Sequence, residues 1–306
     1  MTRDGRAPGL TDAQLRAFID VERLPAEFGR SIDEHFLPLA EWIAAQHQAH
    51  RTLVVGISGA QGTGKSTLAG LLERALGAAG LRVASLSLDD FYLPRSERQE
   101  LAANVHPLLA TRGVPGTHDV ALLLSVIDRL ASADTSLQVP RFDKALDDRV
   151  PVGEWRILRG PADVVLLEGW CIGSVAEAAP ALAKPVNALE ADEDPDGTWR
   201  RWVNDRLAGD YARLNSKLDR LVYLAAPDFE AVYRWRLEQE DKLRTTTAGR
   251  SARLMDPEEL RRFLMHYERI TRANATVLPV IADAVLEFDE RHRCARSRLG
   301  RRATGA

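Results

Sequence analysis

Cysteine is scarce in this sequence. Two cysteines, Cys171 and Cys294, occur among 306 residues, and they lie far apart along the chain. This usage excludes the disulfide framework of a small secreted domain, and it does not offer the paired spacing of a structural zinc site. Because free thiols are typical of a reducing compartment, we expect a cytoplasmic protein.

Long apolar runs are absent as well. No stretch of the sequence approaches the roughly 20 apolar residues that a membrane-spanning helix requires. Residues 1–6 lack the apolar segment of a secretory signal peptide. We therefore expect neither a membrane partner nor export.

An excess of one charge sign is also missing. The chain holds 41 lysines and arginines against 44 aspartates and glutamates, for a net charge of -3. This balance argues against a nucleic-acid-binding protein. Six arginines do gather within residues 291–306. We interpret this basic tail as solvated and poorly ordered, in preference to an arm that binds nucleic acid or membrane.

The chain does contain enough apolar residues for a packed core. Hydrophobic residues make up 45% of the sequence, which excludes an intrinsically disordered protein. Residues 1–50 predict an N-terminal helical extension. Residues 11–14 and residues 31–34 each match a helix-capping box, and Pro38 is expected to kink or restart the second helix.

Strands and helices alternate from residue 53 onward. Apolar runs predict strands at 53–57, 82–88, 137–142, 155–158, 164–167, 221–225 and 284–288. Helical spacing predicts helices at 67–79 and 119–131, and a third from Asp228 to residue 244. Continuous apolar strands separated by helices are typical of a parallel sheet covered on both faces. We therefore predict an α/β fold in which ligands bind at the carboxyl ends of the strands.

The most informative motif is a glycine-rich loop between the first strand and the first helix of this pattern. Residues 59–66 match the phosphate-binding pattern G-x-x-x-x-G-K-[ST] in full. Its glycines let backbone N–H groups surround phosphate oxygens, while Lys65 reaches the β- and γ-phosphates and Ser66 ligates Mg²⁺. We therefore predict a P-loop protein that binds a nucleotide with β- and γ-phosphates together with Mg²⁺. The predicted nucleotide-binding residues are Gly59, Ala60, Gln61, Gly62, Thr63, Gly64, Lys65, Ser66 and Thr67.

Carboxylates follow two of the predicted strands. Glu168 ends the strand at 164–167, which is the Walker B position for a second Mg²⁺ ligand. The alternative is an acid that caps the following helix. Asp89 and Asp90 end the strand at 82–88, and we assign Asp89 as the base that accepts the proton of a substrate hydroxyl. Asp90 is assigned as a neighbour of the metal or as a group that orients the substrate. Turn formation is the alternative for both aspartates, and which of the two is the base stays open.

Two loops offer groups for an anionic acceptor. Residues 112–119 are turn-rich and carry Arg112 and His118, for which substrate contact is slightly favoured over a purely structural role. Residues 140–149 form a charged stretch that contains Lys144 and Arg149. A solvated loop is the default interpretation of such a stretch, and a lid that holds a carboxylate or phosphate is the alternative.

The helix after Asp228 carries a further cationic pair. Arg234 and Arg236 each precede a glutamate by four residues, so surface ion pairing would account for both. The alternative is that these arginines cover the nucleotide phosphates as part of a lid. Residues 245–250 are polar and could be the mobile part of that lid.

These segments together resemble D-glycerate 3-kinase of the plant type and its bacterial and fungal relatives, within the P-loop kinases that include phosphoribulokinase, uridine kinase and pantothenate kinase. The resemblance covers residues 51–290 and leaves residues 1–50 and 291–306 outside it. It depends on the glycine-rich loop followed, in this order, by D-D-F-Y-L at 89–93, R-G-V-P-G-T-H-D at 112–119, P-R-F-D-K at 140–144, E-G-W at 168–170 and Y-R-W-R-L at 233–237.

The resemblance implies a kinase domain over residues 51–290 that uses ATP and Mg²⁺ and phosphorylates a hydroxyl of D-glycerate. It implies Asp89 as the base, Arg234 and Arg236 as lid groups, and substrate contact by the loop that carries Arg112 and His118. With the candidates from the residues themselves, the predicted substrate-binding residues are Asp90, Tyr92, Arg112, His118, Lys144 and Arg149. The sequence departs from the plant pattern at residues 145–149, where we expect the acceptor to be selected.

Two other functions remain as alternatives. One is a P-loop kinase for another small hydroxylated metabolite, of the pantothenate, uridine or sugar-phosphate type. The other is a nucleotide-binding protein without catalysis, although Lys65, Asp89 and Glu168 together favour an enzyme. The expected partner is a small hydroxy acid, and the sequence does not indicate an oligomeric state.

Overall fold

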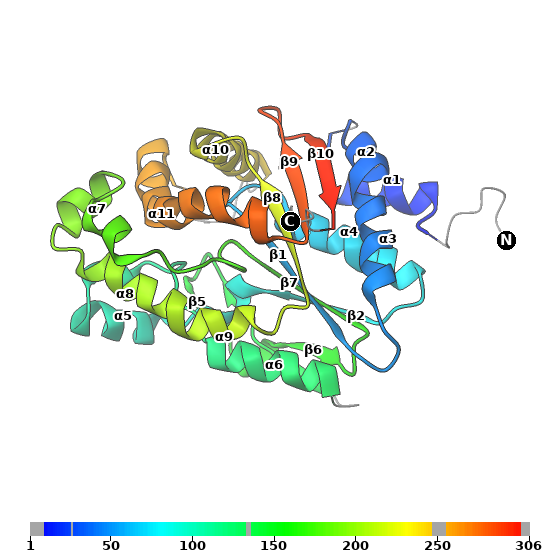
Figure 1. Ribbon diagram of the computed structural model, residues 1–306, viewed down its shortest axis with the longest axis horizontal. Helices are drawn as coiled ribbons and strands as arrows, with labels where there is room; N and C mark the ends of the chain where they lie inside the picture. The colour runs from blue at the N-terminus through cyan, green and yellow to red at the C-terminus, as the bar shows by residue number, and fades with distance from the viewer. Residues whose placement is uncertain (1–8, 26, 133–135, 247–254, 301–306) are drawn as a thin grey trace, which may run out of the picture.

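A six-stranded sheet forms the centre of the molecule (Figure 1). The computed structural model describes residues 9–25, 27–132, 136–246 and 255–300. Five neighbouring strands are parallel, and β10 runs antiparallel at one edge. In spatial order the strands are β10 (Cys294–Leu299), β9 (Ala284–Phe288), β8 (Arg220–Ala225), β1 (Leu53–Gly59), β7 (Val164–Gly169) and β2 (Val83–Ser87). The predicted α/β fold with a mainly parallel sheet is confirmed.

Helices cover both faces of this sheet, as predicted. The central strands β1 and β7 are buried along their whole length. Successive residues of β1 contribute to different cores, since Val54 packs in one cluster and Val55 in the other. Figure 1 shows α3 and α4 on one side of the sheet and α6 and α9 on the other. Among the described residues, no helix combines the length and apolar character needed to cross a membrane.

The helices have the following bounds. They are α1 (Asp12–Val21), α2 (Phe28–Ser31), α3 (Leu37–Gln46), α4 (Lys65–Ala78), α5 (Arg95–Asn104), α6 (Val120–Ser132), α7 (Ala188–Glu193), α8 (Thr198–Arg206), α9 (Ala212–Asn215), α10 (Phe229–Thr246) and α11 (Pro257–Ile281). A π-helical turn, Ile32–Phe36, joins α2 to α3, and a second one, Leu207–Tyr211, joins α8 to α9.

The N-terminal helices confirm one predicted capping box and contradict the other. Thr11 caps α1 by accepting a hydrogen bond from the Gln14 amide, and Gln14 reciprocates. Ser31 makes no such bond, because its backbone is already helical and the chain continues from α2 into the π turn. Pro38 lies in the first turn of α3, directly after the π turn, so α3 restarts at the predicted proline.

The basic C-terminal segment corrects a second expectation. Residues 294–299 are not a poorly ordered tail, because they form β10 and pair with β9. Arg293 is paired with Asp289 and Arg296 with Glu287, so acids of the same sheet edge balance much of the basic charge. Residues 301–306 lie outside the described residues.

A small insertion precedes β7. Its outer strands, β3 (Ser136–Val139) and β6 (Arg156–Arg159), lie near the two strands predicted at 137–142 and 155–158, and they pair with each other outside the main sheet. The charged stretch between them folds into a short hairpin of β4 (Phe142–Asp143) and β5 (Asp148–Arg149). Alternation of side chains cannot reveal strands of two residues, so the sequence predicted only a loop here. This hairpin carries Lys144 to the functional site.

Candidate active site

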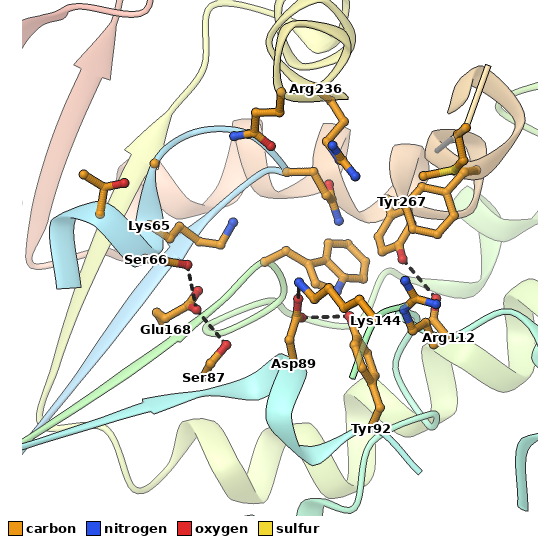
Figure 2. Close-up of a pocket in the computed structure, with 18 residues that line it drawn as sticks. Lys65, Ser66, Ser87, Asp89, Tyr92, Arg112, Lys144, Glu168, Arg236 and Tyr267 are labelled. Atoms are coloured by element: carbon orange, nitrogen blue, oxygen red, sulfur yellow. Dashed lines mark hydrogen bonds and ion pairs between the residues drawn. The ribbon is translucent and has the colours of Figure 1, made fainter. Parts of the chain in front are cut away.

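One pocket of about 390 Å³ lies at the carboxyl ends of β1, β2 and β7. The ends of these strands supply the glycine-rich loop, Asp89 and Glu168, which all line it. Figure 2 shows Lys65, Ser66 and Glu168 at one end of the pocket, Arg112 and Tyr267 at the other, and Asp89 between them. The residues predicted at the three strand ends, Lys65, Asp89 and Glu168, therefore lie in one cleft.

The phosphate-binding end is a tight turn between β1 and α4. Gly62 and Gly64 have φ of +81° and +88°, a left-handed conformation that a side chain would strain. Lys65 begins α4, and its ammonium donates a hydrogen bond of 2.8 Å to the carbonyl of Ala60. Burial lowers the pKa of Lys65, and the nearby Glu168 and Asp89 carboxylates oppose that shift. The loop therefore holds a partly buried cation beside the start of a helix, where phosphate oxygens bind.

Oxygen ligands for a divalent cation gather beside this loop. Glu168 is 8% exposed, and its Oε1 accepts hydrogen bonds from Ser66 Oγ at 3.0 Å and from Ser87 Oγ at 2.6 Å. Hydroxyl and carboxylate oxygens are the ligands that Mg²⁺ prefers, together with water and substrate phosphates. The residues present therefore fit the predicted Mg²⁺ site. Ser87 was not among the predicted site residues, because the sequence marks it only by its place at the end of β2.

Asp89 is held at the middle of the pocket by two donors. Its carboxylate accepts hydrogen bonds from Tyr92 Oη at 2.7 Å and from Lys144 Nζ at 2.6 Å. Burial opposes ionisation, but the charge of Lys144 and the two hydrogen bonds outweigh it and hold the pKa of Asp89 well below its usual range. The carboxylate is therefore ionised and able to accept a proton.

Asp90 faces a different part of the molecule. Its Oδ1 accepts a hydrogen bond of 3.3 Å from the amide of Phe142 in the β4–β5 hairpin, and burial raises its pKa. Asp90 is not among the described residues that line the pocket. This placement favours Asp89 over Asp90 as the base and gives Asp90 a structural contact with the hairpin.

The far end of the pocket is lined by cations and aromatic rings. Arg112 is ion-paired with Asp147 of the hairpin. Its own carbonyl accepts a hydrogen bond of 3.0 Å from Tyr267 Oη, and the next carbonyl, of Gly113, accepts one of 2.8 Å from Trp170 Nε1. Two aromatic side chains therefore fix the loop that presents Arg112. The E-G-W segment pointed to Trp170, whereas no motif marked Tyr267.

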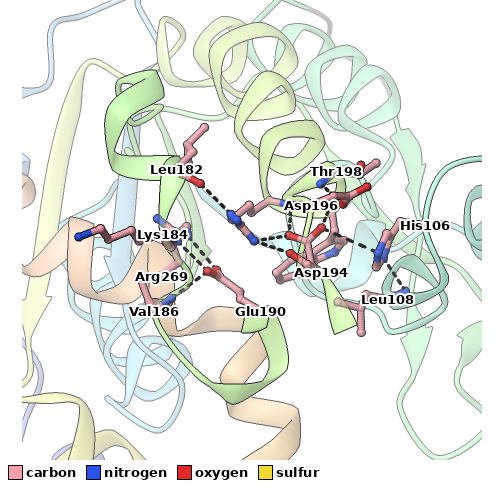
Figure 3. Close-up of polar contacts among 12 residues, drawn as sticks. His106, Leu108, Leu182, Lys184, Val186, Glu190, Asp194, Asp196, Thr198 and Arg269 are labelled. Atoms are coloured by element: carbon pink, nitrogen blue, oxygen red, sulfur yellow. Dashed lines mark hydrogen bonds and ion pairs between the residues drawn. The ribbon is translucent and has the colours of Figure 1, made fainter. Parts of the chain in front are cut away.

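Tyr267 lies on α11, a helix that takes part in a buried ion pair (Figure 3). Two residues further along this helix, Arg269 makes bonds of 2.8 and 2.6 Å to the two carboxylate oxygens of Glu190 on α7. Nearby, Arg200 of α8 pairs with Asp194 at 3.0 Å. These charges are almost fully buried, and such pairs are stable only when their hydrogen bonds are satisfied. The first pair joins α11 to α7, and the second joins α8 to the end of α7.

His118 and Arg149 lie behind the pocket wall, which changes their predicted roles. The imidazole of His118 is 5% exposed, stacks on Tyr92 and bonds through Nδ1 to Tyr211 Oη at 2.5 Å. Burial lowers its pKa to about 4, so the ring is neutral near pH 7. Arg149 donates bonds of 3.2 and 2.9 Å to the Tyr92 carbonyl. Neither is among the described residues lining the pocket, so both support Tyr92 and are not placed to bind substrate.

The comparisons with known proteins agree with this geometry. No protein-family model matches the chain. A kinase of Schizosaccharomyces pombe named mug58, described as uncharacterized, is 37% identical over 226 residues, which are 71% of this chain and 79% of that protein. The chain belongs to the P-loop kinases related to D-glycerate 3-kinase.

Two further relatives of this kinase are informative. The chloroplastic D-glycerate 3-kinase of Arabidopsis thaliana is 29% identical over 252 residues, which are 76% of this chain and 52% of that protein. The solved structure of D-glycerate 3-kinase from Cryptococcus neoformans superposes with a TM-score of 0.70 at 25% identity, covering 86% of this chain and 98% of that one. The protein is thus an ATP-dependent phosphotransferase of the P-loop type.

The two arginines predicted as lid groups separate in space. Arg236 lines the pocket and is ion-paired with Glu240 one turn later, so the predicted i,i+4 pair is present. Arg234 is half-exposed and pairs with Glu290 after β9. It is not among the described residues that line the pocket, so the structure does not support its predicted catalytic role. Of the predicted mobile lid, residues 247–250 lie outside the described residues.

Proposed function

We propose that this kinase transfers the γ-phosphoryl group of ATP to a hydroxyl of D-glycerate and releases 3-phosphoglycerate and ADP. The carrying observation is the position of the Asp89 carboxylate, between a phosphate-binding loop and a cation-lined end of the same pocket. The two relatives named as D-glycerate 3-kinases support this acceptor. A small hydroxy acid also suits a pocket of about 390 Å³ that must hold the triphosphate as well.

At the phosphate end, the loop amides and Lys65 hold the β- and γ-phosphates. Ser66 and Glu168 would hold Mg²⁺, which supplies positive charge against the phosphate oxygens when it is bound. Arg236, on the α10 wall of the pocket, adds a cation that can stabilise charge as it develops on the transferred group.

At the acceptor end, Arg112 is the group that binds the carboxylate of the substrate, while Lys144 pairs with Asp89. The substrate hydroxyl then lies against Asp89. Its oxygen forms the new bond to the γ-phosphorus, the bond to the ADP oxygen breaks, and the hydroxyl proton passes to Asp89. Tyr92 and Lys144 keep Asp89 ionised until that proton arrives.

The acceptor is tested by measuring ADP release with D-glycerate, pantothenate, uridine and ribulose 5-phosphate, each at saturating ATP and Mg²⁺. We expect turnover with D-glycerate that far exceeds turnover with the other three. Turnover of one of those three without turnover of D-glycerate would refute the proposed acceptor, and ATP binding without any phosphorylated product would refute an enzyme.

The substitution Asp89→Asn tests the base directly. It keeps the shape of the side chain but removes its ability to accept a proton, so we expect kcat to fall by about 10²- to 10⁴-fold. The affinity for ATP should stay within about twofold of the parent value, because the phosphate end is unchanged. The matched control is Asp90→Asn, for which we expect a smaller loss of kcat. Near-normal turnover by Asp89→Asn contradicts the assignment.

A further inference from the structure

An arginine outside the pocket holds together the segments that form the acceptor end of the pocket. Arg98 lies on α5 and is 1% exposed, which makes it one of the most deeply buried side chains of the described chain. Its guanidinium donates hydrogen bonds to three carbonyls, those of Leu93 at 3.2 Å, Ala110 at 2.7 Å and Asp147 at 2.7 Å. A buried guanidinium requires such partners, because an unpaired one is very unfavourable.

These carbonyls belong to three separate segments that each deliver a side chain to the pocket. Leu93 follows Tyr92, Ala110 precedes Arg112 by two residues, and the β4–β5 hairpin carries Lys144. One buried side chain therefore joins all three segments on the side facing away from the substrate.

The same arginine begins a chain of ion pairs that ends in the pocket. One oxygen of the Asp147 carboxylate lies 3.0 Å from Arg98, and the other is paired with Arg112. Asp147 is thus held from behind by a buried cation and in turn fixes the guanidinium that faces the acceptor. Its backbone has φ of +55°, an uncommon conformation for an aspartate, which persists only where the surroundings impose it.

The charges of this end favour an acceptor with one negative charge. Lys144 is matched by Asp89, whereas Asp147 is shared between two arginines, Arg98 and Arg112. The set leaves one positive charge unmatched. A neutral acceptor would not use that charge, and a phosphate dianion would exceed it.

We propose that Arg98 and Asp147 are positioning residues that orient Arg112 toward a single carboxylate, and that they restrict the acceptor to small monocarboxylate hydroxy acids. The proposal rests on the proposed function of a hydroxy-acid kinase and names the residues that select the acid. Neither residue touches the acceptor, and both act through Arg112.

The test measures KM for the acceptor and KM for ATP in the variants Arg98→Met and Asp147→Asn. We expect KM for D-glycerate to rise about tenfold in each, because a misplaced guanidinium loses a charge-assisted bond. KM for ATP should stay within about twofold. Asparagine tolerates the left-handed backbone of position 147, so Asp147→Asn changes the charge and leaves the hairpin intact.

Matched variants separate positioning from folding. Arg95→Met makes the same substitution at an exposed position of the same helix, and its kinetic constants should equal those of the parent. Arg98→Lys keeps the charge opposite Asp147 but loses the fork of donors, so we expect KM for D-glycerate between those of the parent and Arg98→Met. Thermal unfolding of every variant identifies loss of fold.

The outcomes distinguish this inference from the proposed function. Parent enzyme that phosphorylates pantothenate and not D-glycerate refutes the proposed acceptor, and the same KM comparison is then made on pantothenate, which is also a monocarboxylate. Parent enzyme that prefers uridine or glycerol, or that turns over no carboxylate, overturns both. An unchanged or lower KM for the acceptor in folded Asp147→Asn overturns the inference alone, since it would show that Asp147 only screens Arg112.

Discussion

The two ends of the pocket are built in different ways. The phosphate end is built around the single turn between β1 and α4, where the Lys65 ammonium bonds to a carbonyl five residues away, and the ends of β2 and β7 add Ser87 and Glu168 beside it. The acceptor end is assembled from distant segments. Arg98 and Asp147 are 49 residues apart, and the Tyr267 hydroxyl bonds to the Arg112 carbonyl across 155 residues. Local backbone geometry forms the glycine-rich loop of the phosphate end, whereas tertiary packing brings the acceptor end together.

This difference indicates how the kinase can keep one reaction while its acceptor changes. A turn whose shape depends on its own glycines binds triphosphate wherever a strand and helix flank it. An end that depends on ion pairs between separate loops can change its selectivity when one loop changes. Residues 145–149, where the sequence departs from the plant pattern, include Asp147.

The largest effect is expected from Lys65→Met, which damages the phosphate end alone. We expect kcat to fall by about 10³-fold, because the cation that contacts the γ-phosphate is lost. KM for the acceptor should change by less than about threefold. Steady-state kinetics with both substrates varied would check this, and a large rise in the acceptor KM would contradict the separation of the two ends.

A smaller effect is expected from substitution of the two arginines on α10. Arg236→Met should lower kcat by roughly 30-fold, because Arg236 lines the pocket. Arg234→Met should change kcat by less than about twofold, since its pair with Glu290 is on the surface. The two variants make the same substitution two residues apart on one helix, so equal losses of kcat would refute the different roles.

The smallest effect is a shift in pH dependence caused by Lys144→Met at the acceptor end. Lys144 holds the pKa of Asp89 down, and burial alone would raise it. The base must be ionised, so activity is lost as pH falls through that pKa. Removing the lysine should therefore move the acid limb of kcat/KM to higher pH. A pH–rate profile of parent and variant measures the shift, and an unmoved acid limb would contradict control of Asp89 by Lys144.

Much of the fold and part of the site could be predicted from local pattern. The buried strands β1, β7 and β8 appear as continuous apolar runs, and the glycine-rich loop identifies its own flanking strand and helix. Ser31 shows the limit of a local signal. It matches a capping box, but the helix does not begin there, because the preceding residues are already helical. The segment 294–299 shows another limit, because strand pairing with β9 overrides its polar composition.

Side-chain roles at the acceptor end could not be predicted in the same way. His118 and Arg149 have the chemistry of anion-binding groups, but burial behind Tyr92 uses their hydrogen bonds inside the protein. No sequence pattern marks Arg98 as buried, because the sequence does not distinguish a buried arginine from an exposed one on the same helix. Tyr267 likewise belongs to an amphipathic helix without a motif.

The amino-acid sequence by itself determined the parallel sheet, the phosphate loop and the residues at the strand ends, because these depend on backbone propensity and on side chains near in the chain. Only the tertiary structure decided which cations reach the acceptor. Direction, burial and pairing of a charged side chain depend on neighbours brought together by packing, and residue type and order do not specify those neighbours.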